Sequence, residues 1–85
     1  MEKEQISEKV KEIIAYSAGC EVSDVNDQTN FQDDLGMDSL DRELAIMKLE
    51  QEFSIEIHDE EGIKANTTED IVELIIKKQN KDEQK

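Results

Sequence analysis

Apolar residues recur at helical spacing in three separate segments of this 85-residue chain, and that pattern limits the fold to a small helical bundle. Residues three and four apart share one face of a helix, so each segment presents an apolar stripe to a common core. The stripes are Ile6, Val10, Ile13 and Ile14 in a helix over about 2–17; Ala45, Ile46, Leu49 and Phe53 in a helix over 39–53; and Ile71, Val72, Leu74, Ile75 and Ile76 in a final helix that ends at Lys77 and Lys78.

The remaining segments predict one short helix and irregular connections. Residues 59–64 are expected to form a single helical turn, and Thr67 with Asp70 makes a capping-box pattern before the final helix. We therefore expect an all-α fold, a small bundle of three main helices plus one short helix, with a long loop between the first two. The expected boundaries are one domain over 1–85, ordered over about 2–78, with a frayed tail over 79–85.

The long loop runs from Cys20 to Met37 and follows Gly19, which is expected to end the first helix. It has no sustained apolar period and is rich in the turn-forming residues Ser, Asp and Asn. We expect four apolar side chains to pin it to the core, namely Val22, Val25, Phe31 and Leu35. A loop of this length in a small domain usually serves a function.

Ser39 lies where this loop turns into the second helix. Asp38 is a suitable N-cap residue and Asp41 follows three positions later, which resembles a capping box. A hydroxyl at a helix start is exposed and faces unpaired backbone N–H groups and the positive end of the helix dipole. A phosphate attached to Ser39 would be stabilised there, so this residue has the features of a tethering point.

Negative charge is concentrated in the middle of the chain. The net charge is −13, and residues 27–61 hold 12 acids against Arg42 and Lys48, a net of −10. This charge argues against binding nucleic acid or anionic lipid and indicates partners with basic patches. Charge alone is equally typical of a solvated surface, and the serine motif within the acidic block favours a docking surface.

Several other chemistries lack the residues they need. His58 is the only histidine and no Gly-x-Ser-x-Gly motif is present, so Ser39 has no partners for hydrolysis. Cys20 is the only cysteine, which excludes an internal disulfide, and no metal-ligand spacing or calcium loop is complete. No signal peptide and no membrane-spanning run is found, so we expect a cytoplasmic protein.

The strongest motif runs from Phe31 to Ile57. It reads Phe-x-x-Asp-Leu-Gly-x-Asp-Ser-Leu-Asp, followed by Met-x-Leu-Glu-x-Glu-Phe-x-Ile-Glu-Ile, and it closely resembles the acyl carrier proteins of fatty-acid synthesis. The resemblance implies that Ser39 carries 4′-phosphopantetheine donated by coenzyme A, with Asp38 helping to position magnesium during that transfer. It also implies a carrier without catalytic residues of its own, which is the substrate of a phosphopantetheinyl transferase and holds acyl groups as thioesters.

The resemblance and the helical spacing together give two sets of candidate site residues. Partner recognition is assigned to Asp38, Leu40, Asp41, Leu44, Met47 and Glu50, of which Leu40, Leu44 and Met47 form a second apolar line on the helix. Lining of an acyl cavity is assigned to Ile46, Phe53, Ile57, Ile63 and Ala65. The expected partners are the transferase, acyltransferases, ketosynthases and other thioester-using enzymes. We expect a monomer with no nucleic-acid partner, no tightly bound metal and no stable membrane insertion.

Some positions depart from the usual family pattern and leave alternatives open. Glu43-Leu44-Ala45 stands where Val-Glu-Leu is typical, so Leu44 is either a docking residue or a core residue, and Ala45 either leaves room for an acyl chain or is compensated by Leu44. Met47 has core filling as its alternative role. Arg42 adds a positive charge to a face that is commonly acidic. The alternative functions are a carrier for an aminoacyl, D-alanyl or polyketide unit, and an acidic adaptor without a cofactor.

Overall fold

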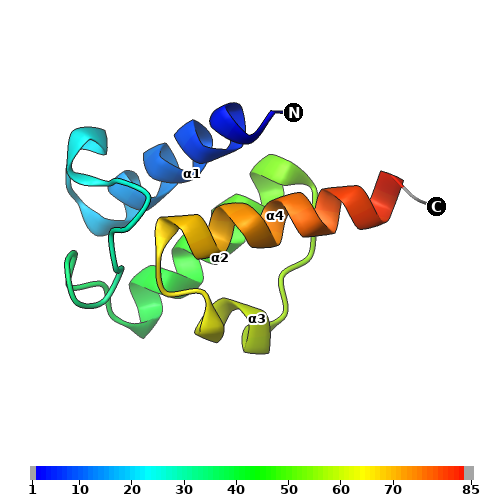
Figure 1. Ribbon diagram of the computed structural model, residues 1–85. Coiled ribbons are helices and arrows are strands. Elements are labelled where there is room, and N and C mark those ends of the chain that lie inside the picture. The colour runs from blue at the N-terminus through cyan, green and yellow to red at the C-terminus, as the bar shows by residue number, and fades with distance from the viewer. Residues whose placement is uncertain (1, 84–85) are drawn as a thin grey trace.

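The computed structural model describes residues 2–83, and within that range it contains helices and no strand (Figure 1). The elements are α1 (Lys3–Ala18), the 3₁₀ turn η1 (Val22–Asp24), α2 (Ser39–Phe53), α3 (Asp59–Lys64) and α4 (Thr68–Glu83). The all-α prediction of three main helices and one short helix is confirmed. None of the described helices is both long enough and apolar enough to cross a bilayer.

Helix α1 packs against both α2 and α4 and supplies one wall of the core. Its buried residues Ile6, Val10 and Ile14 belong to the predicted apolar stripe. The helix ends at Gly19, whose φ of 76° lies in the left-handed region that glycine adopts without a Cβ clash. Figure 1 shows α1 and α4 running in opposite directions along the bundle.

The loop after α1 is anchored by side chains and by backbone hydrogen bonds. Val25, Phe31 and Met37 are buried, and the Phe31 N–H donates to the Asn66 carbonyl at 2.9 Å. Val22 was predicted to pin the loop, and this was wrong, because η1 leaves its side chain 46% exposed. The burial of Met37 was not predicted, and it fixes the chain two residues before Ser39.

Helix α2 occupies the predicted residues and turns its stripe toward the core. Ala45, Leu49 and Phe53 are buried as expected, whereas Ile46 is half-buried at the edge that faces α3. Both predicted ends of α2 are confirmed. Ser54 caps the helix directly after Phe53 and adopts a left-handed conformation with φ of 53°.

Helix α4 is longer than predicted. It begins after the expected capping box, in which the Asp70 N–H donates to the Thr67 hydroxyl at 3.2 Å. The expected end at Lys78 was wrong, because the helix continues to Glu83. The chain contains no proline, and residues 79–83 include no glycine, so nothing in the local sequence stops the helix earlier. Residues 84 and 85 of the predicted frayed tail lie outside the described residues.

Candidate functional site

Ser39 is the first residue of α2 and is exposed to solvent. The Asp41 N–H donates to Asp38 Oδ1 at 2.9 Å, and the Asp38 N–H lies 3.4 Å from Asp41 Oδ2, so the predicted reciprocal capping box is present. Within the described part of the chain, no hydrogen bond occupies the Ser39 hydroxyl. The cap therefore fixes the backbone of this turn and leaves the hydroxyl available.

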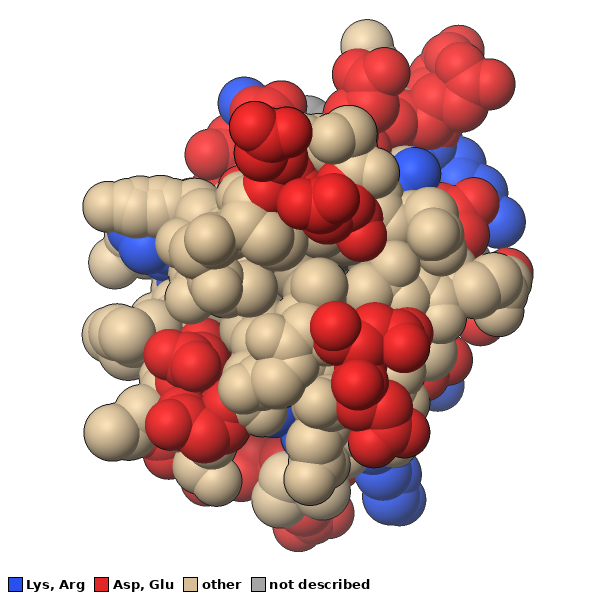
Figure 2. Space-filling model, turned by 90° about the vertical axis from the view of Figure 1, so that its left-hand side faces the viewer, with Lys and Arg blue, Asp and Glu red and all other residues tan. Residues whose placement is uncertain are grey.

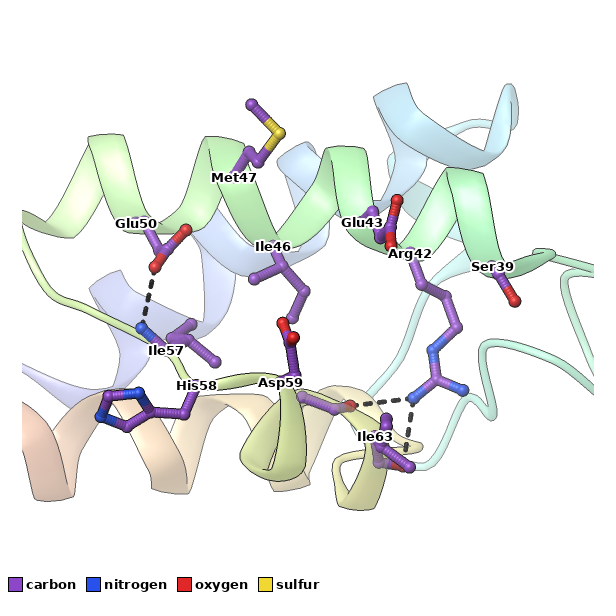
Figure 3. Close-up of a pocket in the computed structure, with 11 residues that line it drawn as sticks. Ser39, Arg42, Glu43, Ile46, Met47, Glu50, Ile57, His58, Asp59 and Ile63 are labelled. Carbon is purple, nitrogen blue, oxygen red and sulfur yellow. Dashed lines mark hydrogen bonds between the residues drawn. The ribbon is translucent and has the colours of Figure 1, made fainter.

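An open cleft of about 450 Å³ begins at Ser39 and runs between α2 and α3 (Figure 3). Its lining combines apolar side chains with charged ones. The lining residues are Ser39, Arg42, Glu43, Ile46, Met47, Glu50, Ile57, His58, Asp59, Gly62 and Ile63. Of the predicted cavity residues, Ile46, Ile57 and Ile63 lie here.

A second, much smaller space of about 10 Å³ lies deeper, beside the core. Ala65 and Ala45 both line it, so the small side chain at Ala45 does leave a gap, although only a water-sized one. Phe53, predicted as a lining residue, lines neither space and is buried in the core instead. The predicted cavity residues therefore do not line one common space, although Ile46 lines both the cleft and the inner cavity.

Arg42 bridges α2 and α3 and is not a free surface charge. Its Nη2 donates to the carbonyl oxygens of Gly62 at 3.0 Å and Ala65 at 3.2 Å, with longer contacts of 3.4 Å to the Ile63 carbonyl and Asn66 Oδ1. Figure 3 marks the contacts to Gly62 and Ile63. Sequence reasoning missed this role. The sequence signal that could have indicated it is the four-residue spacing between Arg42 and Ile46. This spacing places Arg42 on the same face of α2 as a predicted cavity residue.

Glu50 also makes a contact within the protein. Its Oε2 accepts a hydrogen bond from the Ile57 N–H at 2.9 Å, which ties the segment between α2 and α3 to the C-terminal part of α2 (Figure 3). The side chain was predicted to meet partners, and it is half-buried. Its structural task is to close the end of the cleft that lies away from Ser39.

The second apolar line of α2 faces solvent. Leu40, Leu44 and Met47 are 68%, 53% and 54% exposed, so the core alternatives for Leu44 and Met47 are wrong. The face that Figure 2 shows bears groups of acidic side chains among uncharged residues, with most of the basic side chains toward its edges. An exposed apolar stripe on a strongly acidic protein has the composition of a docking surface.

Helix α3 is held to the neighbouring helix α4 as well as to α2. Glu61 Oε1 lies 2.6 Å from Lys78 Nζ and accepts a hydrogen bond from the His58 N–H at 3.0 Å. The Lys78 ammonium, and next the His58 N–H, lower the pKa of Glu61 below its ordinary value. This six-residue helix therefore depends on side-chain anchors at both of its ends.

Comparison with known proteins agrees with this arrangement. A family model described as a phosphopantetheine attachment site matches residues 8–75. An acyl carrier protein of Solidesulfovibrio magneticus is 44% identical over 73 residues, which are 86% of this chain and 94% of that protein. One from Chlorobium phaeobacteroides is 41% identical over 78 residues, covering 92% and 100%. The solved acyl carrier protein of Enterococcus faecalis superposes with a TM-score of 0.77 at 36% identity, covering 92% of this chain and 99% of that one.

These matches define the class as carrier domains that bear covalently attached 4′-phosphopantetheine. Within that class, the chain belongs to the acyl carrier protein family. The resemblance drawn from the Phe31–Ile57 motif is confirmed, and so are the carrier function and the cofactor.

Proposed function

We propose that Ser39 is the attachment residue for 4′-phosphopantetheine. The single observation that carries this proposal is the position of its exposed hydroxyl, at the N-terminus of the 15-residue α2 and at the mouth of the cleft. The donor chemistry fits the group, because the first-turn N–H groups and the helix dipole favour a phosphodiester beside them. When bound, the arm supplies the thiol on which acyl groups are held as thioesters.

Asp38 has a double task in this proposal. Its Oδ1 caps α2 and thereby holds the Ser39 backbone, while the side chain as a whole stays exposed next to the attachment point. A carboxylate in that place would assist a magnesium ion during transfer of the arm from coenzyme A. The protein is then the substrate of the transferase and contributes no catalytic residue to later reactions.

The docking surface of the proposed carrier combines Leu40, Leu44 and Met47 with the acids of the same region. The acidic side chains steer encounter with basic enzyme surfaces, and the apolar stripe supplies desolvated contact once the partner has docked. Asp38 and Asp41 complete the recognition set at the start of α2. Glu50 contributes less, because one of its oxygens is already bound to the Ile57 N–H.

The proposed partners are the transferase, acyltransferases and ketosynthases, each docking through a basic patch. The proposed cargo is an acyl intermediate of fatty-acid or related lipid synthesis, in keeping with the relatives named acyl carrier protein. We also propose that residues 1–85 act as one monomeric domain in the cytoplasm.

Intact-mass measurement tests the attachment site. The protein is incubated with coenzyme A, magnesium and a broad-specificity phosphopantetheinyl transferase, and the wild type should gain one phosphopantetheinyl group. Ser39→Ala should gain none, while Ser23→Ala, which removes another exposed serine, should gain it as the wild type does. An unmodified wild type would favour the cofactor-free adaptor instead, and a modified Ser39→Ala would move the site elsewhere.

A further inference from the structure

The outer cleft and the inner cavity are neighbours separated by a thin partition. Among the residues that the structure describes, the ones that line both spaces are Arg42, Ile46 and Gly62. Figure 3 shows the Arg42 and Ile46 side chains extending from α2 toward α3. A group that passes directly from the cleft beside Ser39 to the cavity beside the core crosses this partition.

Arg42 is the part of the partition that also joins the two helices. The carbonyl groups that it contacts, at Gly62, Ile63 and Ala65, include some that the end of a short helix leaves without an internal partner. A guanidinium at a helix C-terminus also meets the negative end of the helix dipole. These charge-assisted bonds are stronger than neutral ones, so releasing Arg42 should loosen α3 from α2.

Gly62 is the part of the partition that keeps it thin. A Cβ at this position would lie 3.2 Å from Ile46 Cδ1, which is a tighter contact than carbon atoms normally make. Glycine inside a helix is less favourable than alanine. Gly62 therefore gives up helix stability at a place where a side chain would extend into the space between α3 and Ile46.

The inner cavity in its present form has room for about one water molecule and for no alkyl chain. The outer cleft is large enough to hold a short acyl group without entering the core. Building on the proposed carrier function, we propose that Arg42 and Gly62 determine which acyl lengths are sequestered. Arg42 acts as a latch: its bonds hold α3 against α2, and they must break before a longer acyl chain moves inward. Gly62 has no side chain to block the passage between the cleft and the inner cavity, so the passage can open.

Two variants with opposite effects test this proposal. Arg42→Ala removes the latch, and Gly62→Ala fills the passage while favouring the helix. Lys48→Ala is the control, because it removes an equal charge from α2 where the side chain contacts Tyr16 rather than α3. Each protein is loaded enzymatically from butyryl- and octanoyl-coenzyme A, loading is verified by intact mass, and cleavage of the thioester by hydroxylamine is timed.

Arg42→Ala should slow cleavage of the octanoyl form about tenfold, which corresponds to burying about two further CH₂ groups, and leave the butyryl form unchanged. Gly62→Ala should accelerate cleavage of the octanoyl form, and Lys48→Ala should match the wild type. Unchanged octanoyl cleavage in Arg42→Ala, or equal changes for both acyl lengths, would overturn the assignment of length selection to Arg42.

Amide hydrogen exchange on the unloaded proteins tests the latch without any cargo. The N–H groups of Gly62 and Ala65 donate to the carbonyl oxygens of His58 and Glu61 along α3, and they should exchange about tenfold faster in Arg42→Ala than in the wild type or Lys48→Ala. Equal amide exchange rates in the three proteins would contradict the proposal that Arg42 holds α3 to α2. Failure of the carrier function is recognised separately, because the wild type would then gain no acyl-phosphopantetheinyl mass.

Discussion

Glu61 and Lys78 form an ion pair of 2.6 Å that joins the first turn of α3 to α4. Arg42 holds the last turn of the same helix to α2. A helix of six residues has little stability of its own, so its position is set by these two contacts and by the burial of Ala65 directly after it. Changing either contact should alter α3 more than it alters the rest of the bundle.

The Glu61 ion pair predicts a defined pH dependence of stability. Because the pKa of Glu61 is lowered in the folded protein, the pair stabilises the fold fully above the unfolded pKa of about 4.3, and this contribution is lost as pH falls through the lowered folded value. Glu61→Gln should reduce the free energy of unfolding at pH 7 by about 1 kcal/mol or less, since the pair is partly exposed. Urea titrations at pH 7 and pH 3 measure the difference.

At pH 3 that difference between the wild type and Glu61→Gln should shrink toward zero. Lys78→Met is a second test variant, because it removes the other residue of the ion pair. Its free energy of unfolding should lose the same pH-dependent contribution. A difference that stays constant between the two pH values would contradict the assigned role of the ion pair.

Asp38→Ala should lower the free energy of unfolding by about 1 kcal/mol, because the Asp41 N–H then lacks its side-chain acceptor. Asp33→Ala is the matched control: it removes the same charge from an exposed position in the same loop and should stay within about 0.5 kcal/mol of the wild type. Chemical denaturation monitored by circular dichroism provides both values. Equal losses in the two variants would indicate a general charge effect rather than capping.

Leu44→Ala should leave stability within about 0.5 kcal/mol of the wild type, because the side chain is more than half exposed. It should also reduce kcat/KM of the phosphopantetheinyl transferase about fivefold through lost apolar contact. Thermal unfolding and steady-state kinetics on the same preparation separate the two effects. A destabilised variant with unchanged transferase and acyltransferase kinetics would exclude the docking role.

The two faces of α2 should respond differently to truncation. Leu49 is fully buried, so Leu49→Ala should cost about 2–5 kcal/mol, enough to threaten the fold of a domain this small. Met47→Ala, two residues away on the exposed face, should cost less than about 0.5 kcal/mol. Urea midpoints with unchanged slopes would verify the comparison, and similar losses would mean that α2 is rotated relative to the described orientation.

Features encoded within a few residues were predictable from the sequence. Both ends of α2 follow from a local capping box and a local apolar period, and the position of Ser39 follows from the same turn. The family followed from the spacing within Phe31–Ile57. The same local signals failed at the end of α4, because the polar residues after Lys78 neither require a helix nor stop one.

Features that depend on how the helices pack were decided only by the tertiary structure. The sequence left Leu44 equally suited to the core or the surface, and the packing of α1 on α2, which buries Ala45 and Leu49 and leaves Leu44 exposed, resolved that choice. From the sequence, Arg42 was interpreted as a surface charge, because its acceptors at Gly62 and Ala65 lie at least 20 residues further along the chain. A short apolar period reports which face is buried, whereas a side chain's distant partners exist only after the chain has folded.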